Sequence, residues 1–572
     1  MNALKFLFYH SSLIALFIGI SASPSAGQSW AWNQSGYNPV FIGGADMPVA
    51  TDKNGNAFIT GEYLTLITFG NYTLTSPYIN TYLVKYNSAG TVMWAQQLSE
   101  PNGGNCVSNS VTTDAAGNIY LAGAFAGGTV QAGTFYLTDN NTSNPDAYII
   151  KYNAAGTVLW AKQSVIPAGN NNSIAEAGTV ATDRFGNVFL SGEFGGKASF
   201  GSFNLNTSSP DGSNTFLVKY DSNGNELWAA QSITPINDSL TISDEVTTDN
   251  NGNAYLAGVF DLTITFGSFT LTNTSLTHAS FLVKYSPLGN ILWAKQVTNV
   301  SSFSTSASTS VVTDMANNIY TTGYFSNTVE FGSHTLKTTG VDNIFLAKYD
   351  TNGNVIWAKA PSSAPSVSWI ATGLAADVYN RIYLAGISNQ NPRTLTFDNY
   401  SLQVNPPTTD AAFLMKFDTA GNPICGSMLS GSSQLNGVAC ERTGTYVYMA
   451  GIYSDTLFCG SDTLVAPAGA GTTFLGRWKS CTDAEGVVSL KTSAEEMNVY
   501  PNPFTNVTTV AINANGTYYL EIDDLAGRKL NEIEFTGIQY QLSAQGLAKG
   551  LYFIRAFDSN KVPIGTSKIV IQ

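Results

Sequence analysis

Histidine, the side chain that most often acts as a general base, is scarce in this sequence. Of the three histidines among 572 residues, His278 lies in a polar stretch and His334 replaces the aromatic residue of a recurring phrase. A Ser-His-Asp arrangement would need one of them, and neither has a catalytic motif around it. We interpret His334 as a packed or edge imidazole and predict no catalytic residue.

Carboxylates are the other candidates for chemistry. Glu62, Glu193 and Asp261 each follow a recurring glycine closely, so they could meet at one rim of a repeat fold. Two such carboxylates could hydrolyse a glycosidic bond by a mechanism that their separation decides. A solvated rim is the alternative, and we take it as the default.

The recurring Asp-x-x-Gly-Asn segments superficially resemble calcium loops. Residues 249–253 and 350–354 offer carboxylate and amide oxygens but lack the distal glutamate of an EF-hand. Between strands, Asn and Gly accept positive φ and Asp binds its own backbone, so we interpret these segments as turns. We predict no metal site and no cofactor, because no cysteine pair has C-x-x-C spacing and no phosphate-binding glycine loop precedes a helix.

Tryptophan recurs in a Trp-Ala phrase. The rings could stack on sugars, but the flanking Leu, Ile and Met favour packing between repeats. Trp369 and Tyr379 fall outside the pattern and are better candidates for a loop surface. The recurring tryptophans are Trp94, Trp160, Trp228, Trp293 and Trp357.

Composition and the first residues indicate an exported protein. Charged residues make up 11% of the chain and the formal net charge is -13, which argues against nucleic acid or an anionic membrane as partner. Residues 1–27 combine Lys5, an apolar stretch and small residues, which is typical of a secretory signal peptide. No later stretch is apolar enough to cross a bilayer, so we expect no transmembrane segment.

Cysteines can form disulfides in an exported chain. Four of the five lie near the end of the repeats, and we predict that they form two disulfides there while Cys106 stays free. Four cysteines allow three pairings, and the sequence does not choose among them. These four are Cys425, Cys440, Cys459 and Cys481.

A ten-residue phrase of the form D-x-x-G-N-x-Y-x-x-G recurs about every 65 residues, in six good copies and a degenerate seventh. Each unit adds phrases of the types TFGSFTL, FLVKY and LWAAQ, which have the composition and the turn residues of short strands. Four strands per unit, repeated seven times, predict an all-β, seven-bladed β-propeller. Trp30-Ala31 stands alone before the first unit, and we predict that it supplies the fourth strand of the last blade and closes the ring.

These units resemble the SBBP-type β-propeller repeats of exported bacterial proteins, over residues 28–481. After a linker at 482–496, residues 497–572 show five or six short strands, enough for a small immunoglobulin-like sandwich. The phrases YPNP (500–503), DLAGR (524–528), GLY (550–552) and the final KIVIQ are similar to those of the type A sorting domain of the Bacteroidetes type IX secretion system. This resemblance implies contact with that machinery, removal of residues 497–572 by a sortase-like peptidase, and a secreted or outer-surface location.

A propeller can serve as an enzyme or as a binding protein. We expect a binding, adhesion or scaffold module that takes a glycan or protein ligand at its loop face, where segments such as 139–146 and 206–213 differ most between units. The alternative is a secreted polysaccharide-degrading enzyme with carboxylates at the rim or channel.

Overall fold

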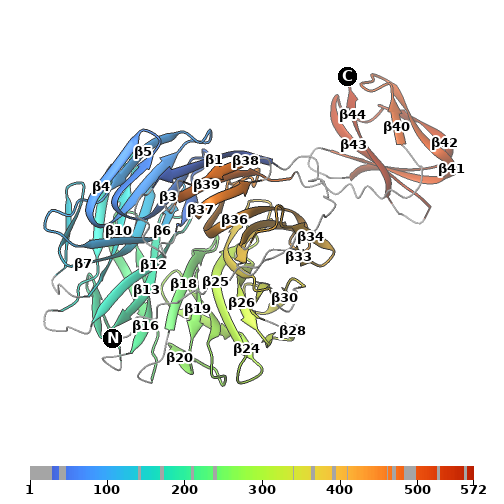
Figure 1. Ribbon diagram of the computed structural model, residues 1–572. Coiled ribbons are helices and arrows are strands. Elements are labelled where there is room, and N and C mark those ends of the chain that lie inside the picture. Colours follow the sequence, from blue (N-terminus) through green and yellow to red (C-terminus); the bar gives the residue numbers. More distant parts are fainter. Residues whose placement is uncertain are drawn as a thin grey trace. The chain divides into compact units, whose positions relative to one another are not determined.

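The computed structural model consists of strands, turns and loops, with no helix in the part that it describes. The described residues are 29–37, 47–139, 144–167, 173–207, 212–235, 241–338, 341–362, 367–388, 394–408, 410–459, 462–466, 472–481, 497–524, 529–559 and 563–572. The signal peptide predicted at 1–27 and the linker predicted at 482–496 lie outside them. The chain divides into two compact units, Met1–Cys481 and Thr482–Gln572 (Figure 1).

Repeats two to five each form a separate four-stranded antiparallel sheet. In each sheet the chain runs from the first strand to the fourth in spatial order, so neighbours in sequence are neighbours in space. The strands are β6 (Asn105–Thr113), β7 (Ile119–Ala126), β10 (Asp146–Tyr152) and β11 (Val158–Gln163); β12 (Ile174–Thr182), β13 (Val188–Gly195), β16 (Ser213–Tyr220) and β17 (Glu226–Gln231); β18 (Thr241–Thr248), β19 (Ala254–Phe260), β22 (Ala279–Tyr285) and β23 (Ile291–Gln296); β25 (Thr305–Thr313), β26 (Ile319–Ser326), β29 (Asn343–Tyr349) and β30 (Val355–Lys359).

Repeats six, seven and one are joined into one twelve-stranded sheet. The long strand β36 (Pro423–Cys440) pairs with repeat six through its first half and with repeat seven through its second. The other main strands of repeat six are β31 (Ile370–Ala376), β32 (Ile382–Ser388) and β35 (Ala411–Phe417), and those of repeat seven are β37 (Tyr446–Cys459) and β39 (Thr472–Lys479). Repeat one contributes β2 (Val49–Thr51), β3 (Ala57–Phe69), β4 (Tyr72–Tyr86) and β5 (Val92–Gln97).

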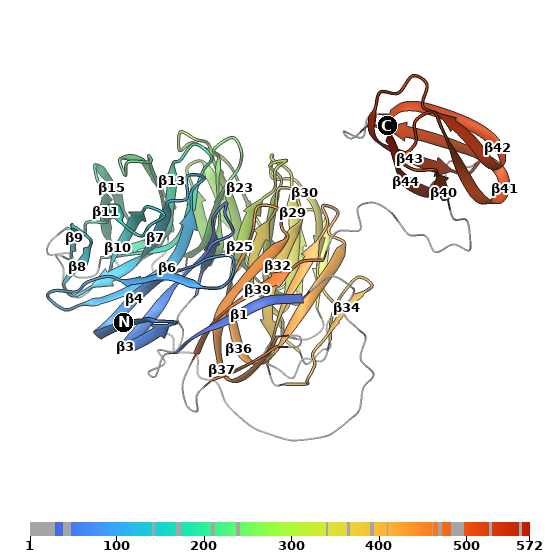
Figure 2. The same ribbon diagram turned by 90° about the horizontal axis from the view of Figure 1, so that it is seen from above.

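The N-terminal strand belongs to the end of the repeat region. Strand β1 (Ser29–Tyr37) pairs antiparallel with β39, from Ser29 opposite Lys479 to Tyr37 opposite Thr472, and the two lie side by side in Figure 2. It therefore takes the outer position that the Trp-Ala strand holds in the other repeats, which is the pairing predicted for Trp30-Ala31.

The assignment of the four strands needs one correction. The TFGSFTL phrase is not a strand of the four-stranded sheet but a separate hairpin, as in β20 (Thr263–Phe266) with β21 (Phe269–Thr272). The remaining strand is the one before each D-x-x-G-N phrase, such as β18 with the sequence TISDEVTT. It escaped the sequence analysis because it is rich in Ser and Thr rather than in large apolar residues. The equivalent hairpins are β8 (Thr129–Ala132) with β9 (Phe135–Thr138), β14 (Lys197–Phe200) with β15 (Phe203–Asn206), β27 (Thr328–Phe331) with β28 (His334–Lys337), and β33 (Thr394–Phe397) with β34 (Tyr400–Gln403).

These hairpins lie beside the outer strand of each sheet. The Gln231 side chain, at the end of β17, accepts a hydrogen bond from Asn206 N at 3.0 Å and donates one to Asn206 O at 2.8 Å. The glutamine amide thus makes the two hydrogen bonds that a backbone residue of a neighbouring strand would make. It holds the hairpin against a sheet edge that would otherwise be open, and the hairpin hinders edge-to-edge association. Gln163 and Gln296 repeat the arrangement on Thr138 and Thr272.

Consecutive repeats are joined by a lysine and a tryptophan. Lys219 Nζ and Trp228 Nε1 donate to the same oxygen, the carbonyl of Pro287, at 3.0 and 3.1 Å. The Trp228 ring also lies so close to Gly289 that a Cβ added there would be 2.9 Å from it. The tryptophans therefore pack between repeats, as their flanking residues indicated. Equivalent pairs are Lys151 with Trp160 on Ser222, Lys284 with Trp293 on Thr351, and Lys348 with Trp357 on Thr419.

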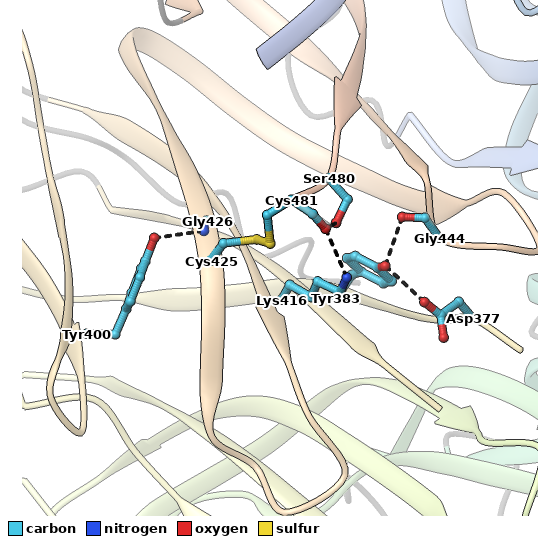
Figure 3. The surroundings of a disulfide bond; sticks show 9 residues. All are labelled: Asp377, Tyr383, Tyr400, Lys416, Cys425, Gly426, Gly444, Ser480 and Cys481. Carbon is cyan, nitrogen blue, oxygen red and sulfur yellow. Dashed lines mark hydrogen bonds between the residues drawn. A yellow bond between two sulfur atoms is a disulfide. The ribbon is translucent and has the colours of Figure 1, made fainter. Parts of the chain in front are cut away.

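One disulfide fastens the end of the repeat region. Cys425 of β36 is bonded to Cys481, 56 residues later, and Lys416 Nζ donates to the Cys481 carbonyl at 3.2 Å (Figure 3). The prediction of two disulfides is wrong, because Cys440 and Cys459 carry free thiols, as Cys106 does. Cys440 pairs with Val447 at one end of the β36–β37 ladder and Cys459 with Leu429 at the other, so the ladder itself separates the two thiols.

The C-terminal domain is a five-stranded antiparallel sheet around its own core. Its long strand β41 pairs with three of the others. Asn502 of the YPNP phrase binds the last strand, because its Oδ1 accepts from Val570 N at 2.9 Å and its Nδ2 donates to Lys568 O at 2.5 Å. The GLY phrase pairs with the same strand, Gly550 opposite Ile571, so three of the four family phrases meet there. The strands are β40 (Met497–Tyr500), β41 (Val507–Asp523), β42 (Lys529–Ser543), β43 (Gly550–Phe557) and β44 (Pro563–Ile571).

Candidate functional site

The first strand of every repeat lines one cavity. The strands β2, β6, β12, β18, β25, β31 and β36 contact one another in this order, and β36 contacts β2 again, so they form a closed cycle. They surround a cavity of about 620 Å³, a size usual for small-molecule sites. The described residues that line it include Ser, Thr and Asn side chains, Asp244 and Glu245, and no Lys, Arg or His.

A ring of hydrogen bonds runs around this cavity just before the D-x-x-G-N phrases. Each side chain of the ring donates to the backbone carbonyl of its counterpart in the preceding repeat, at 2.7 to 3.0 Å. The ring therefore ties repeat seven to repeat one as firmly as it ties the others. The donors and acceptors are Thr113 to Thr51, Thr182 to Thr113, Thr248 to Thr182, Thr313 to Thr248, Cys440 to Ala376, and Thr51 to Cys440.

Ala376 has no side-chain donor and interrupts this ring. We expect Ala376→Thr to supply the missing hydrogen bond to the Thr313 carbonyl and to raise the free energy of unfolding by about 1 kcal/mol. Thr182→Val, which removes one existing bond, should lower it by a similar amount. Urea unfolding followed by tryptophan fluorescence measures both. A destabilised Ala376→Thr would show that the ring cannot be completed at that position.

Glu245 is the carboxylate that sequence analysis missed. Its Oε2 accepts hydrogen bonds from Ser310 Oγ and, at 2.8 Å, from Val311 N of the next repeat. Burial raises its pKa to about 7. Ser110 and Ser310 make the same contact to the next strand, on Val180 N and Leu374 N. The recurring pattern before each D-x-x-G-N phrase, as in SVTTD and EVTTD, was the available signal.

The three acids predicted to meet at a rim lie in three separate surroundings. Glu62 pairs with Thr81 across β3 and β4. Glu193 lies directly opposite Glu176 across β12 and β13, and burial followed by the charge of Glu176 raises the pKa of Glu193 to about 8. Asp261 Oδ1 is 2.5 Å from His278 Nδ1.

The two histidines have different roles. The bond to Asp261 raises the pKa of His278, and the His278 side chain stays 41% exposed. His334 lies opposite Phe331 in its hairpin, where sequence analysis placed a packed or edge imidazole.

The other candidate residues divide between core and surface. Trp369 was wrongly assigned to a loop surface, because it is fully buried and packs edge-on against Phe413 at 5.7 Å. Tyr379 is 62% exposed in its turn. Parts of the predicted binding loops, 140–143 and 208–211, lie outside the described residues.

The Asp-x-x-Gly-Asn segments have the contacts of turns. Asp249 Oδ1 accepts from the backbone N of Asn251 and Asn253, and Oδ2 accepts from the Asn253 side chain and the Tyr255 hydroxyl. Both carboxylate oxygens are thus occupied within the turn. In the described part of the chain, no three His, Cys, Asp or Glu side chains converge as metal ligands would.

Several carboxylates near the ends of the sheets are predicted to make stability depend on pH. Burial raises the pKa values of Glu100, Asp146 and Glu245 to about 7, and that of Glu193 to about 8. The folded state therefore binds more protons than the unfolded chain from about pH 4.5 to 8, so stability should fall as pH rises through this window. The raised pKa of His278 acts in the same direction.

Thermal unfolding at pH 5, 6, 7 and 8 measures this dependence. We expect the midpoint to decrease steadily toward pH 8 and Glu193→Gln to flatten the decrease. The lowered pKa values of Asp221 and Asp350 act only at lower pH, where they favour a stability optimum near pH 5. A midpoint that rises between pH 5 and 8 would contradict the prediction.

The strands and their contacts define an all-β repeat protein with a polar central cavity. Its similarity to known proteins indicates where it is located. Residues 498–572 match the family described as "Secretion system C-terminal sorting domain". The protein is therefore exported by type IX secretion and is secreted or located at the cell surface. No helix in the part that the structure describes is long and apolar enough to cross a membrane.

The chain is similar to a curated protein at low identity. An uncharacterised WD repeat-containing protein, L264 of Acanthamoeba polyphaga mimivirus, is 26% identical over 438 residues, covering 62% of this chain. The chain spans only 30% of that protein's length. This similarity agrees with a repeat protein and assigns no activity.

Solved structures resemble the chain weakly. A protein of unknown function from Dyadobacter fermentans is 9% identical with a TM-score of 0.35, covering 79% of this chain and 99% of its own. PorZ, a surface component of the type IX secretion system of Porphyromonas gingivalis, is 11% identical with a TM-score of 0.21, covering 93% and 82%. TM-scores this low support no conclusion about fold or function.

Proposed function

We propose that this chain is a seven-bladed β-propeller of the SBBP type that acts as a binding, adhesion or scaffold module outside the cell. The closed cycle of seven inner strands, the hydrogen-bond ring between them and the pairing of β1 with β39 support a closed ring of seven blades. The C-terminal domain is then a small immunoglobulin-like sandwich, supported by a long strand that pairs with three others around one core.

The domain boundaries of this proposal are a signal peptide at 1–27, the propeller at 28–481, a linker at 482–496 and the sorting domain at 497–572. The division of the chain after Cys481 supports the boundary between propeller and linker. A sortase-like peptidase would cut in the linker and release the propeller, or attach it to the surface.

In this proposal the polar cavity is a binding site. It offers hydroxyls, amides and two carboxylates, with no cationic side chain among the described residues that line it. Such a lining suits a neutral polar ligand and disfavours an anionic one, because the negative charge of Asp244 would repel an anion and no cationic side chain among the described lining residues would attract it. Neutral glycans fit this description.

The full-length protein, incubated with immobilised polysaccharides, tests the proposal. Both retained protein and released reducing ends are measured. Retention without sugar release supports a binding module. Sugar release would show that the protein is an enzyme rather than a binding module. If the protein is not retained and no sugar is released, the function would be protein binding or a scaffold role.

A polysaccharide-degrading enzyme is the second candidate, and Glu176 with Glu193 is the observation that favours it. Glu193 lies directly opposite Glu176 across β12 and β13, so the two side chains are neighbours on adjacent strands, and glycosidases use a pair of carboxyl groups that flank the bond to be cleaved. A raised pKa suits Glu193 to the role of acid. Glu193→Gln would abolish sugar release by such an enzyme and leave retention unchanged.

A further inference from the structure

Three turns and loops of repeat four and of its connection to repeat five expose an unusual group of apolar side chains. Leu276 is 77% exposed, Phe303 71%, Val300 52% and Leu262 44%. Leu276 N donates to Ser302 O at 2.9 Å, so the loops carrying Leu276 and Phe303 are in direct contact. We call these four residues, with His278 and Asp261, the Leu276–Phe303 surface.

A buried hydrogen-bond network holds these loops in place. Asn299, only 6% exposed, donates through Nδ2 to Ser275 Oγ at 2.9 Å and to His278 O at 2.8 Å. Ser306 Oγ donates to Asn299 Oδ1 at 3.1 Å, and Ser306 N to His278 O at 3.1 Å. The loops are therefore fixed from within by polar side chains, which leaves the apolar ones outside.

The loop that carries Phe303 has a further anchor. Strand β24 (Thr298–Asn299) pairs with β27, Val300 N donates to Thr328 O at 3.1 Å, and Asn327 Nδ2 donates to Phe303 O at 2.7 Å. The equivalent contacts in repeats one to three are single bridges, such as Ile233 with Thr265. The extra pairing positions an exposed ring on a rigid support, as binding sites require.

Polar groups adjoin these apolar side chains. Asp261 precedes Leu262, and its Oδ1 is 2.5 Å from His278 Nδ1. Because Nδ1 is held by the carboxylate, Nε2 is the ring nitrogen that can meet a ligand hydroxyl. Phe303 and His278 lie on loops that contact each other through Leu276 N and Ser302 O, so this surface can combine stacking on an aromatic ring with directional hydrogen bonds.

From this geometry we propose that the Leu276–Phe303 surface binds a sugar ring of a neutral glycan, with Phe303 under the ring and the His278–Asp261 pair on its hydroxyls. This inference rests on the proposed binding function and adds a second site, on the loops, for the same class of neutral ligand as the cavity. This surface comprises six residues, whereas a protein interface of standard size takes in roughly 20 to 30 residues on each side. A uronate polymer is disfavoured, because Asp261 would face its carboxylates.

Two variants of the full-length protein test the site, with one matched control. Phe303→Ala and His278→Ala are compared with Phe185→Ala, which removes a ring that is 59% exposed in a turn of repeat three. The probes are immobilised starch, xylan, galactomannan and mixed-linkage β-glucan, with alginate and polygalacturonate as uronate polymers and an immobilised protein panel.

We expect the unaltered protein to be retained by at least one neutral polysaccharide and by neither uronate polymer. Phe303→Ala and His278→Ala should each weaken this retention about tenfold, and Phe185→Ala should leave it unchanged. Equal retention of all variants would overturn this site while the proposed binding function stands. Retention only by uronates or by proteins would overturn the ligand class, and no retention on any probe would remove the site together with the binding function.

Discussion

Replacing Gly192 by alanine is expected to destabilise the repeat region by about 3 kcal/mol or more. Gly192 closes the third D-x-x-G-N phrase and lies under the bulge of strand β12. A Cβ at this position would be 1.9 Å from Glu176 O and 2.9 Å from Ala177 Cα. Because these atoms belong to the backbone, the two strands would have to separate, and inserting atoms into a packed interior costs roughly 1 to 3 kcal/mol even where side chains can yield.

Gly178→Ala is the matched control, since Gly178 lies in the same repeat on the partner strand. Its added Cβ would be 3.3 Å from its nearest neighbour, Ser243 O, and the reduced entropy of the unfolded chain offsets a small strain. We expect a change below about 1 kcal/mol. Urea unfolding followed by tryptophan fluorescence measures both variants, because all nine tryptophans precede residue 482. Equal stability of the two variants would refute the steric explanation.

Removal of the Cys425–Cys481 disulfide is the second large effect expected. The bond closes a loop of 56 residues, and the loop-entropy relation gives about 4 kcal/mol for a loop of this length. Cys481 follows β39, which is paired with both β37 and β1. Without the bond, the last strand loses its covalent tie to β36, so we expect the double variant Cys425→Ser/Cys481→Ser to unfold at a markedly lower urea concentration.

A reductant provides the independent comparison. Dithiothreitol should lower the midpoint of the unaltered protein to that of the double variant and leave the double variant unchanged. Cys440→Ser is the control: its hydroxyl can still donate to Ala376 O, so stability and the response to reductant should both stay as in the unaltered protein. A reductant-insensitive unaltered protein would show that the bond contributes nothing to stability.

Local patterns were enough to predict the repeat period, the turns and the packing of the recurring tryptophans between repeats. The D-x-x-G-N turn needs Asp, Gly and Asn because their side chains or backbone freedom complete the turn, as the bonds to Asp249 illustrate. The FLVKY strand is buried throughout, as in β22, and burial explains its continuous apolar sequence. The sorting phrases were equally local, and the family match over 498–572 agrees with them.

The inner strand and the candidate sites could not be predicted in the same way. Strand β18 faces a polar cavity, so its Ser and Thr residues do not show the alternation by which a half-buried strand is recognised. Trp369 gives no sign in the sequence that Phe413, 44 positions later, buries it.

The sequence by itself determined the repeat period, the turns, the tryptophans that pack between repeats and the sorting domain, because each is marked by residues that are close together in the chain. Tertiary structure decided what depends on residues far apart in sequence. These features are the bond between Cys425 and Cys481, the position of Glu193 opposite Glu176, and the approach of His278 to Asp261. The physical reason is that side-chain separation follows from how complete sheets pack, which no local pattern encodes.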